Sequence, residues 1–223
     1  MPDHPTDPGQ DPDTLLMLRV RQGDRDAFTD LVERWKQPVI GFIYRTLPDP
    51  DEAEDLAQAT FIQLWKTAGR YQPTARFSTF LFTIARNLCL NEIRRRVRHP
   101  ADSLDEPRPD DEEHPLRQIE DRRQPSADAE VARGELFSLV EESLAALPEK
   151  QRTALILCRE GELSYEEIAT VLQTSLQATK SLIHRARETL KGRLKPYLGS
   201  GEWHRDPPTP PPPPPPDRRS PDR

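Results

Sequence analysis

The sequence predicts an all-α protein of two small helical domains joined by a flexible acidic linker. Apolar residues recur at helical spacing in two separate stretches, residues 13–98 and 131–198. Residues 99–130 between them contain six Asp and five Glu against four Arg, a composition typical of a disordered linker. The chain has 25 prolines in 223 residues and is 34% apolar and 31% charged, which argues against a single large core.

Charge and cysteine usage limit the function classes. The net charge is −6, so a protein that coats DNA through a uniformly basic surface is excluded, although local basic faces are not. Cys89 and Cys158 form no CxxC pair or Cys/His cluster at zinc spacing, so no metal and no cofactor is predicted. The acidic start is no signal peptide, and no apolar run reaches membrane-spanning length. We therefore expect a cytoplasmic protein without an integral membrane segment.

The first domain is expected to begin after a disordered N-terminus, residues 1–12. Residues 13–35 predict two helices that separate near Gly23, with Asp24 or Asp26 as the cap of the second. Pro38 falls near the end of that helix, and residues 39–47 are expected to form a further short one.

Residues 51–66 predict an amphipathic helix with an unusual outer side. At 100° per residue, one face carries a core stripe of Ala53, Leu56, Ala57, Thr60, Phe61 and Leu64. The other side carries Asp51, Asp55, Gln58, Ile62 and Trp65. Acidic groups beside an exposed aliphatic and an aromatic side chain indicate a docking surface for a protein. The alternative is that another element of the same domain covers this face.

Residues 69–76 predict a loop, and residues 78–96 a long helix with a basic end. Leu81, Ile84 and Leu88 are expected on its core side. Aromatic, amide and guanidinium groups close together suit melted nucleic acid, because bases stack on rings and phosphates pair with Arg. The alternative is a core helix whose Arg residues only complement its dipole.

The second domain is predicted to be helical and to end in a helix–turn–helix. Ser164 and Glu167 can form a capping box, and Thr174 with Gln177 can cap the next helix. That helix, residues 176–190, has a narrow apolar back and a polar, cationic front, as major-groove reading requires. A small bundle with a solvated basic face is the alternative. The tail, residues 199–223, contains an unbroken proline run at 210–216 and is expected to be extended and disordered.

Three blocks together carry a family resemblance: DEAEDLAQATFIQLWK, FSTFLFTIARNLCLNEIRRR and the stretch from LAALPEKQRTALILC to LIHRARETL. In this order they strongly resemble a bacterial RNA polymerase sigma factor of the extracytoplasmic-function (ECF) subfamily of the sigma-70 family. The resemblance implies a region 2 bundle, a region 4 helix–turn–helix, and promoter-specific initiation by binding rather than by catalysis. It implies as partners the RNA polymerase core, through the β′ clamp helices, promoter DNA and an anti-sigma factor.

The resemblance also implies roles for individual residues. Core-polymerase binding falls on Asp51, Asp55, Gln58, Ile62 and Trp65. Contacts to the −10 element and to melted DNA fall on Tyr71, Arg76, Phe80, Asn87, Arg94, Arg95 and Arg96. Contacts to the −35 element fall on Gln177, Lys180, Ser181, His184, Arg185 and Arg187.

Two departures from the family pattern bear on these roles. Phe80 stands where the family commonly has Trp, and Leu182 replaces a frequent Arg, which removes one phosphate contact. A helix–turn–helix regulator that never joins polymerase remains the alternative function. A nucleic-acid hydrolase is disfavoured because clustered metal-ligand carboxylates are lacking outside the linker and docking segments.

Overall fold

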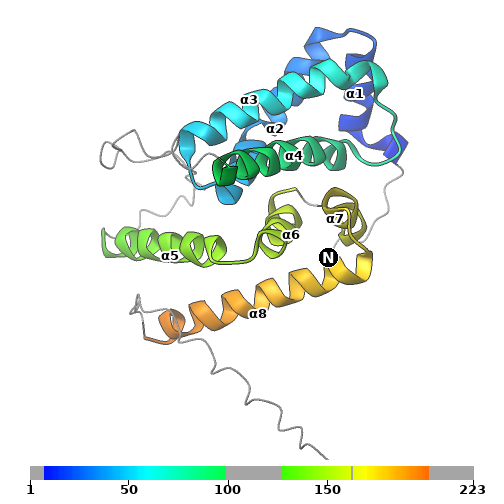
Figure 1. Cartoon of the computed structure of the whole chain (residues 1–223). Helices are drawn as coiled ribbons and strands as arrows, with labels where there is room; N and C mark the ends of the chain where they lie inside the picture. The colour runs from blue at the N-terminus through cyan, green and yellow to red at the C-terminus, as the bar shows by residue number, and fades with distance from the viewer. Residues whose placement is uncertain (1–7, 99–126, 162, 201–223) are drawn as a thin grey trace, which may run out of the picture.

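The fold of the described residues is all-α, as expected. We analysed a computed structural model, which describes residues 8–98, 127–161 and 163–200. Residues 99–126 of the predicted linker and 201–223 of the predicted tail therefore lie outside the described residues. The predicted boundaries are wrong at their edges, because residues 127–130 belong to a helix that begins at Ala127 and residues 199–200 to one that ends at Ser200. Figure 1 shows the order of the helices: α1 Pro12–Arg21, α2 Arg25–Thr46, α3 Pro50–Thr67, α4 Phe77–Arg98, α5 Ala127–Ala145, α6 Glu149–Glu160, α7 Tyr165–Leu172 and α8 Leu176–Ser200, with short 3-10 helices Pro8–Gln10 and Ala68–Arg70.

Aspartates begin the first three helices. The side chains of Asp11, Asp24 and Asp49 accept hydrogen bonds from the backbone N–H groups of Thr14, Ala27 and Glu52. An Asp in this position satisfies an otherwise unpaired N–H group of the first turn. The predicted cap at Asp24 is confirmed. Asp11 is buried, so the ordered fold begins earlier than the composition of residues 1–12 suggested.

Helix α2 runs through Pro38 without ending. The predicted separate helix over residues 39–47 is therefore wrong, because these residues continue α2 to Thr46. Proline inside a helix removes one backbone hydrogen bond and costs about 3 kcal/mol. Directly after it, Val39, Phe42 and Ile43 are fully buried, and this burial offsets the cost.

Helix α4 packs through a face slightly rotated from the predicted one. Leu81 is fully buried as expected, but Ile84 and Leu88 are only partly buried. Phe82, Ala85 and Cys89 occupy the core instead. The rotation follows from the second half of the chain, because α4 also packs against α7, so two sides of the helix are covered.

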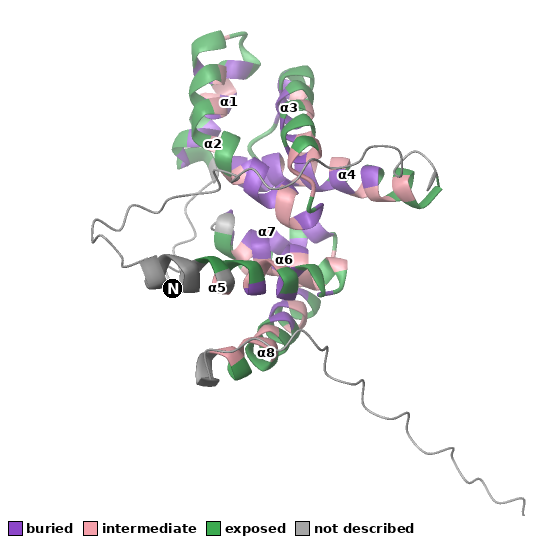
Figure 2. Ribbon diagram, turned by 90° about the vertical axis from the view of Figure 1, so that its left-hand side faces the viewer, coloured by how far each residue is buried: buried purple, intermediate pink, exposed green. Residues whose placement is uncertain are grey.

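The two halves share one apolar cluster. α1–α4 form one layer and α5–α8 the other, and α2 contacts α6 while α4 contacts α7 (Figures 1 and 2). The larger cluster joins Phe82 of the first half to Leu157 and Ile168 of the second. The expectation from composition against a single large core is therefore wrong for the described residues.

The helix–turn–helix is confirmed, with one change in its capping. Ser164 and Glu167 form the predicted capping box at the start of α7. Gln173 then adopts a left-handed conformation with φ of 53°, which turns the chain toward α8. The side chain that accepts from the Ala178 N–H group is Ser175 at 3.2 Å, and Thr174 instead pairs with the buried Thr179 hydroxyl.

Candidate functional site

A groove of about 870 Å³ lies between α2 and α3 on the surface of the first half. Four of the five predicted docking residues line it: Asp55, Gln58, Ile62 and Trp65. Asp51, in the first turn of α3, is exposed but does not line the groove. Ile62 is 48% exposed and Trp65 39% exposed, so no other described element covers them.

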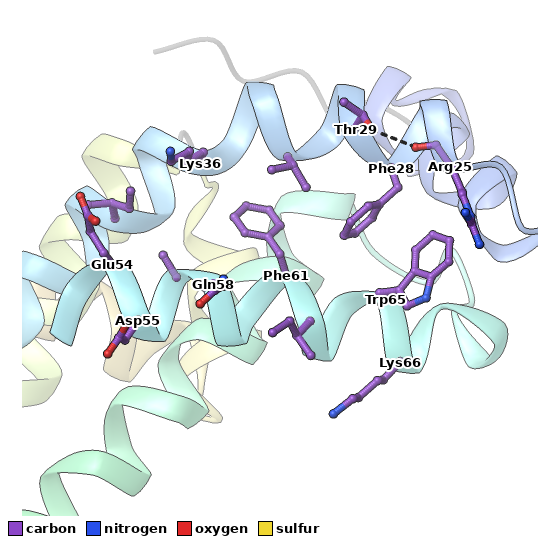
Figure 3. A pocket seen from close by; sticks show the side chains of 14 residues that line it. Arg25, Phe28, Thr29, Lys36, Glu54, Asp55, Gln58, Phe61, Trp65 and Lys66 are labelled. Atoms are coloured by element: carbon purple, nitrogen blue, oxygen red, sulfur yellow. Dashed lines mark hydrogen bonds between the residues drawn. The ribbon is translucent and has the colours of Figure 1, made fainter. Parts of the chain in front are cut away.

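The groove is apolar along its floor and charged along its edges. The rings of Phe28 and Trp65 meet edge to face at one end, with centroids 4.9 Å apart. Phe61 lies between this pair and the end where Lys36, Glu54 and Asp55 lie (Figure 3). An exposed apolar floor with a charged rim is typical of a protein interface.

Sequence reasoning missed the α2 wall of the groove. Phe28 and Val32, which are partly buried against the core, line the groove together with Arg25, Thr29, Lys36 and Ile40. The spacing of Phe28, Val32 and Lys36 by four residues places them on one helix face, and this was the available signal.

The predicted DNA-binding residues of the first half divide into exposed and engaged side chains. Asn87, Arg94 and Arg95 are exposed on α4. Arg96 is only partly exposed, and its guanidinium pairs with Asp49, Glu52 and Glu92. Arg76 is also partly exposed and lies 3.8 Å from Asp11 and 3.9 Å from Glu167.

Tyr71 is not available to a base in this structure. Its side chain is 3% exposed, and its ring packs against Phe80 with centroids 5.1 Å apart. Burial raises the pKa of Tyr71 above its usual value of 10.0. Phe80 is partly exposed, so of the two rings Phe80 is the one that can stack on a base.

The predicted recognition helix, α8, carries most of its candidate DNA-binding residues on one part of its surface. Lys180, Ser181, His184 and Arg185 line one shallow hollow on the surface of the second half. Gln177 is exposed one turn earlier, and Arg187 is also exposed but lies outside this hollow, with Nη2 3.7 Å from Sγ of Cys158 in α6. The apolar back is confirmed, since Thr179, Ile183 and Ala186 are buried.

Comparison with known proteins assigns the family. Residues 31–99 match the model of sigma-70 region 2, and residues 137–190 match that of sigma-70 region 4. The RNA polymerase sigma-H factor of Pseudomonas aeruginosa is 37% identical over 193 residues, which cover 85% of this chain and 97% of that protein. The chain belongs to the sigma-70 family. The ECF RNA polymerase sigma factor SigW of Bacillus subtilis is 34% identical and covers 79% of this chain and 94% of SigW, which supports the ECF subfamily.

Solved structures share the fold of this sigma factor. The sigma factor RpoE in complex with the anti-sigma factor NepR from Bartonella quintana aligns with a TM-score of 0.57 and 26% identity, over 74% of this chain and 97% of that one. CnrH in complex with the cytosolic domain of CnrY aligns with a TM-score of 0.60 over 82% of this chain and 96% of that one, and at 23% identity it shows the fold alone. As a sigma factor, the protein directs RNA polymerase to promoters, and the alternative, a helix–turn–helix regulator that never joins polymerase, is not favoured.

Polar contacts hold the two halves of the sigma factor together. Arg86 of α4 is 6% exposed, donates to the Val171 carbonyl at 3.4 Å and lies 3.6 Å from Glu149. Arg45 of α2 donates to Glu141 of α5 at 3.2 Å. These contacts add to the packing of α4 against α7, so region 4 covers one side of the helix that carries the predicted DNA-binding residues of region 2.

The part of the chain that the structure describes holds no group of three or more His, Cys, Asp or Glu residues that could hold a metal ion. It also has no helix with the length and hydropathy needed to span a membrane.

Proposed function

We propose that this sigma factor docks on the core RNA polymerase through the α2–α3 groove. The observation that carries the proposal is the pairing of Ile62 and Trp65, exposed on α3, with the apolar wall of α2 around Phe28. A helix of the polymerase clamp fits such a groove, since apolar side chains can enter it while Lys36, Asp55 and Lys66 pair with charges at its rim. Asp51 lies outside the groove and would act only at its margin.

The promoter is then read by two separate surfaces. Asn87, Arg94 and Arg95, all exposed on α4, would meet the −10 strand, with Phe80 as the stacking ring and Arg76 as a further contact. Gln177, Lys180, Ser181, His184 and Arg185 at the front of α8 would meet the −35 duplex. Their chemistry suits this division, because amides and guanidiniums read base edges and phosphates, while a ring captures an unstacked base.

Docking must also separate the two halves. Elements at −35 and −10 lie roughly 25 base pairs apart, about 85 Å at about 3.4 Å per base pair. Here α4 contacts α7, which directly precedes the −35 helix, so one molecule in this arrangement cannot meet both elements. We therefore propose that polymerase selects an open arrangement, and that free sigma factor binds promoters poorly.

Three further assignments follow from this role. The protein acts by binding, and we propose that it is not an enzyme. It acts where polymerase and promoter are, so we propose the cytoplasm. The similar RpoE is bound by an anti-sigma factor, and we propose that an anti-sigma factor also regulates this chain by covering the α2–α3 groove.

The docking proposal is tested with purified core polymerase. The double variant Ile62→Asp and Trp65→Ala should lower core affinity at least roughly tenfold, since exposed interface anchors often contribute above 1.4 kcal/mol. The binding constant is measured by fluorescence anisotropy, and run-off transcription should fall with it.

The matched control changes exposed apolar residues elsewhere. Leu15→Asp with Phe137→Ala likewise charges an aliphatic position and truncates an aromatic one, at side chains that are 50% and 45% exposed and line no part of the groove. This control should keep core affinity within about twofold. Equal losses in both double variants, with circular dichroism unchanged, would remove the groove as the docking site.

A further inference from the structure

Helices α3 and α4 form an antiparallel pair that is joined at only one end by the chain. The 3-10 helix Ala68–Arg70 and the loop 71–76 connect the end of α3 to the start of α4. At the opposite end, the start of α3 and the last turns of α4 lie side by side without a covalent link (Figure 1). That open end carries the basic run of α4.

Arg96 joins the two helices at this open end. Its Nε donates to Oε1 of Glu92 at 3.1 Å, one turn back on α4. Its Nη2 donates to Oδ2 of Asp49, the cap of α3, at 3.4 Å, and also to Glu52 in the first turn of α3. We call Asp49, Glu52, Glu92 and Arg96 the Arg96 ion cluster.

The helix dipoles at the start of α3 and at the end of α4 stabilise this cluster. Carboxylates are stabilised at a helix N-terminus and guanidiniums at a C-terminus, and here the two ends are adjacent. Glu92 is buried and also accepts from Arg95 at 2.7 and 2.8 Å, so three carboxylates face two guanidiniums. Removing Arg96 would leave three acids close together with only one cation.

The two arginines that precede Arg96 in the basic run, Arg94 and Arg95, are more exposed than Arg96. Arg94 is exposed and contacts only Asn91 of its own helix, at 3.5 Å, among the described side-chain partners. Arg95 pairs with Glu92 but keeps about half of its side chain exposed. Three consecutive arginines therefore have different exposure, and Arg96 is the one that is partly exposed and reaches Asp49 and Glu52 of α3.

We propose that Arg96 is a positioning residue that sets the DNA-binding end of α4 relative to the polymerase-docking helix α3, and that it is not itself a phosphate contact. This inference rests on the proposed function for the roles of the two helices. It replaces the prediction from sequence that all three arginines of the run contact DNA. Arg94 and Arg95 keep that role.

Salt dependence separates the two roles. Each phosphate contact contributes about 0.9 to the slope of log affinity against log salt on duplex DNA, and about 0.7 on single strands. Losing a contact residue therefore lowers the slope, whereas losing a positioning residue lowers affinity and leaves the slope unchanged. Arg94→Gln is the matched variant for Arg96→Gln, since it removes the same group two residues away.

The experiment uses the full chain, core polymerase and a promoter fragment. Arg96→Gln should keep core affinity within about twofold and lower promoter affinity of the holoenzyme roughly fivefold to tenfold, with an unchanged salt slope. Arg94→Gln should lower the slope by about 0.7–0.9. Adding Glu52→Gln to Arg96→Gln should cause no further loss, because both changes disrupt the same cluster.

A second measurement does not depend on polymerase. In the free protein, amide hydrogen exchange over residues 92–96 should become faster in Arg96→Gln and stay unchanged in Arg94→Gln, and Arg96→Lys should recover part of the protection. Unchanged exchange in Arg96→Gln, or a salt slope that falls as in Arg94→Gln, would overturn the proposal. If wild-type protein fails to bind core polymerase, the proposed function fails, and the exchange measurement still decides the role of Arg96.

Discussion

The guanidinium of Arg86 donates a hydrogen bond to the carbonyl oxygen of Val171, 85 residues later in the chain, at 3.4 Å. Val171 is in the last turn of α7, where the final carbonyls of a helix lack partners within the helix. Arg86 therefore supplies the hydrogen-bond donor that a carbonyl at the C-terminal end of α7, in the opposite half of the molecule, lacks within its own helix. Glu149, 3.6 Å away, partly balances its buried charge.

Replacing Arg86 should loosen the contact between the halves. Arg86→Leu leaves the Val171 carbonyl and Glu149 without this partner, and we expect the free energy of unfolding to fall by about 1.5–3 kcal/mol. Urea denaturation of the full chain measures this change. The adjacent exposed variant Asn87→Ala should stay within about 0.5 kcal/mol. Equal stability of the two variants would show that the Arg86 contact does not hold the halves together.

Gly161 allows the end of α6 to approach α4 closely. A Cβ atom at this position would lie 3.0 Å from Cε2 of Phe82 and 3.1 Å from the Leu157 carbonyl. Gly161→Ala should therefore destabilise the protein by about 1–3 kcal/mol through overpacking. In contrast, Gly134 in α5 has no atom within 4 Å of such a Cβ, so Gly134→Ala should stabilise by about 0.5–1 kcal/mol. Thermal unfolding of both variants measures whether Gly161→Ala lowers the stability and Gly134→Ala raises it.

The two cysteines should react differently with a thiol reagent. Cys89 is fully buried, and this burial raises its pKa to about 12, so at pH 8 it is almost entirely in the unreactive thiol form. Cys158 is only partly buried. We expect iodoacetamide to alkylate Cys158 in the native protein and Cys89 only after unfolding, as peptide mass spectrometry can measure. Alkylation of native Cys89 at a similar rate would contradict the burial of α4 in the shared cluster.

Glu92 should make stability depend on pH in the acid range. The hydrogen bond from Arg95 and a further one from Arg96 hold the pKa of Glu92 below its usual 4.5, against the opposing effect of burial. Asp49 and Glu52 are the acids that face the same guanidinium from α3. The stability that Glu92 contributes is therefore complete above pH 4.5 and is lost as pH falls through its lower folded pKa.

Glu92→Gln tests this dependence. The variant should be less stable than wild type at pH 7, and the difference should shrink as pH falls below 4.5. Chemical denaturation at a series of pH values measures it. A difference that stays constant down to pH 3 would mean that the ion pairs of Glu92 do not contribute to stability.

Much of the local structure was predictable because it depends on neighbours in sequence. The caps at Asp24 and Ser164 and the buried stripe of α3 follow from spacing alone. Helical geometry also placed Ile62 and Trp65 away from that stripe, but whether another helix covers them was left open until the structure showed both exposed. The continuation of α2 through Pro38 was not, because the burial that offsets the proline comes from other helices.

Residues of one type within one motif could not be distinguished by sequence. Arg94, Arg95 and Arg96 are consecutive, yet Arg94 and Arg95 are exposed while Arg96 is partly buried and donates to Asp49 and Glu52 of another helix. Tyr71 and Phe80 are both aromatic residues near the same loop, yet only the tyrosine is buried. Arg187 and Arg185 are both exposed on α8, yet Arg185 lines the hollow with Lys180 while Arg187 contacts Cys158 of α6.

The sequence by itself determined the helical class, the family and the chemistry of each surface, because these depend on residue type and on spacing within a helix. The tertiary structure alone decided which helices pack together: it placed α2 opposite α3 to form the groove, and α7 against α4 through Arg86. Such contacts join residues dozens of positions apart, and their energy depends on fit and on buried partners that no local pattern encodes.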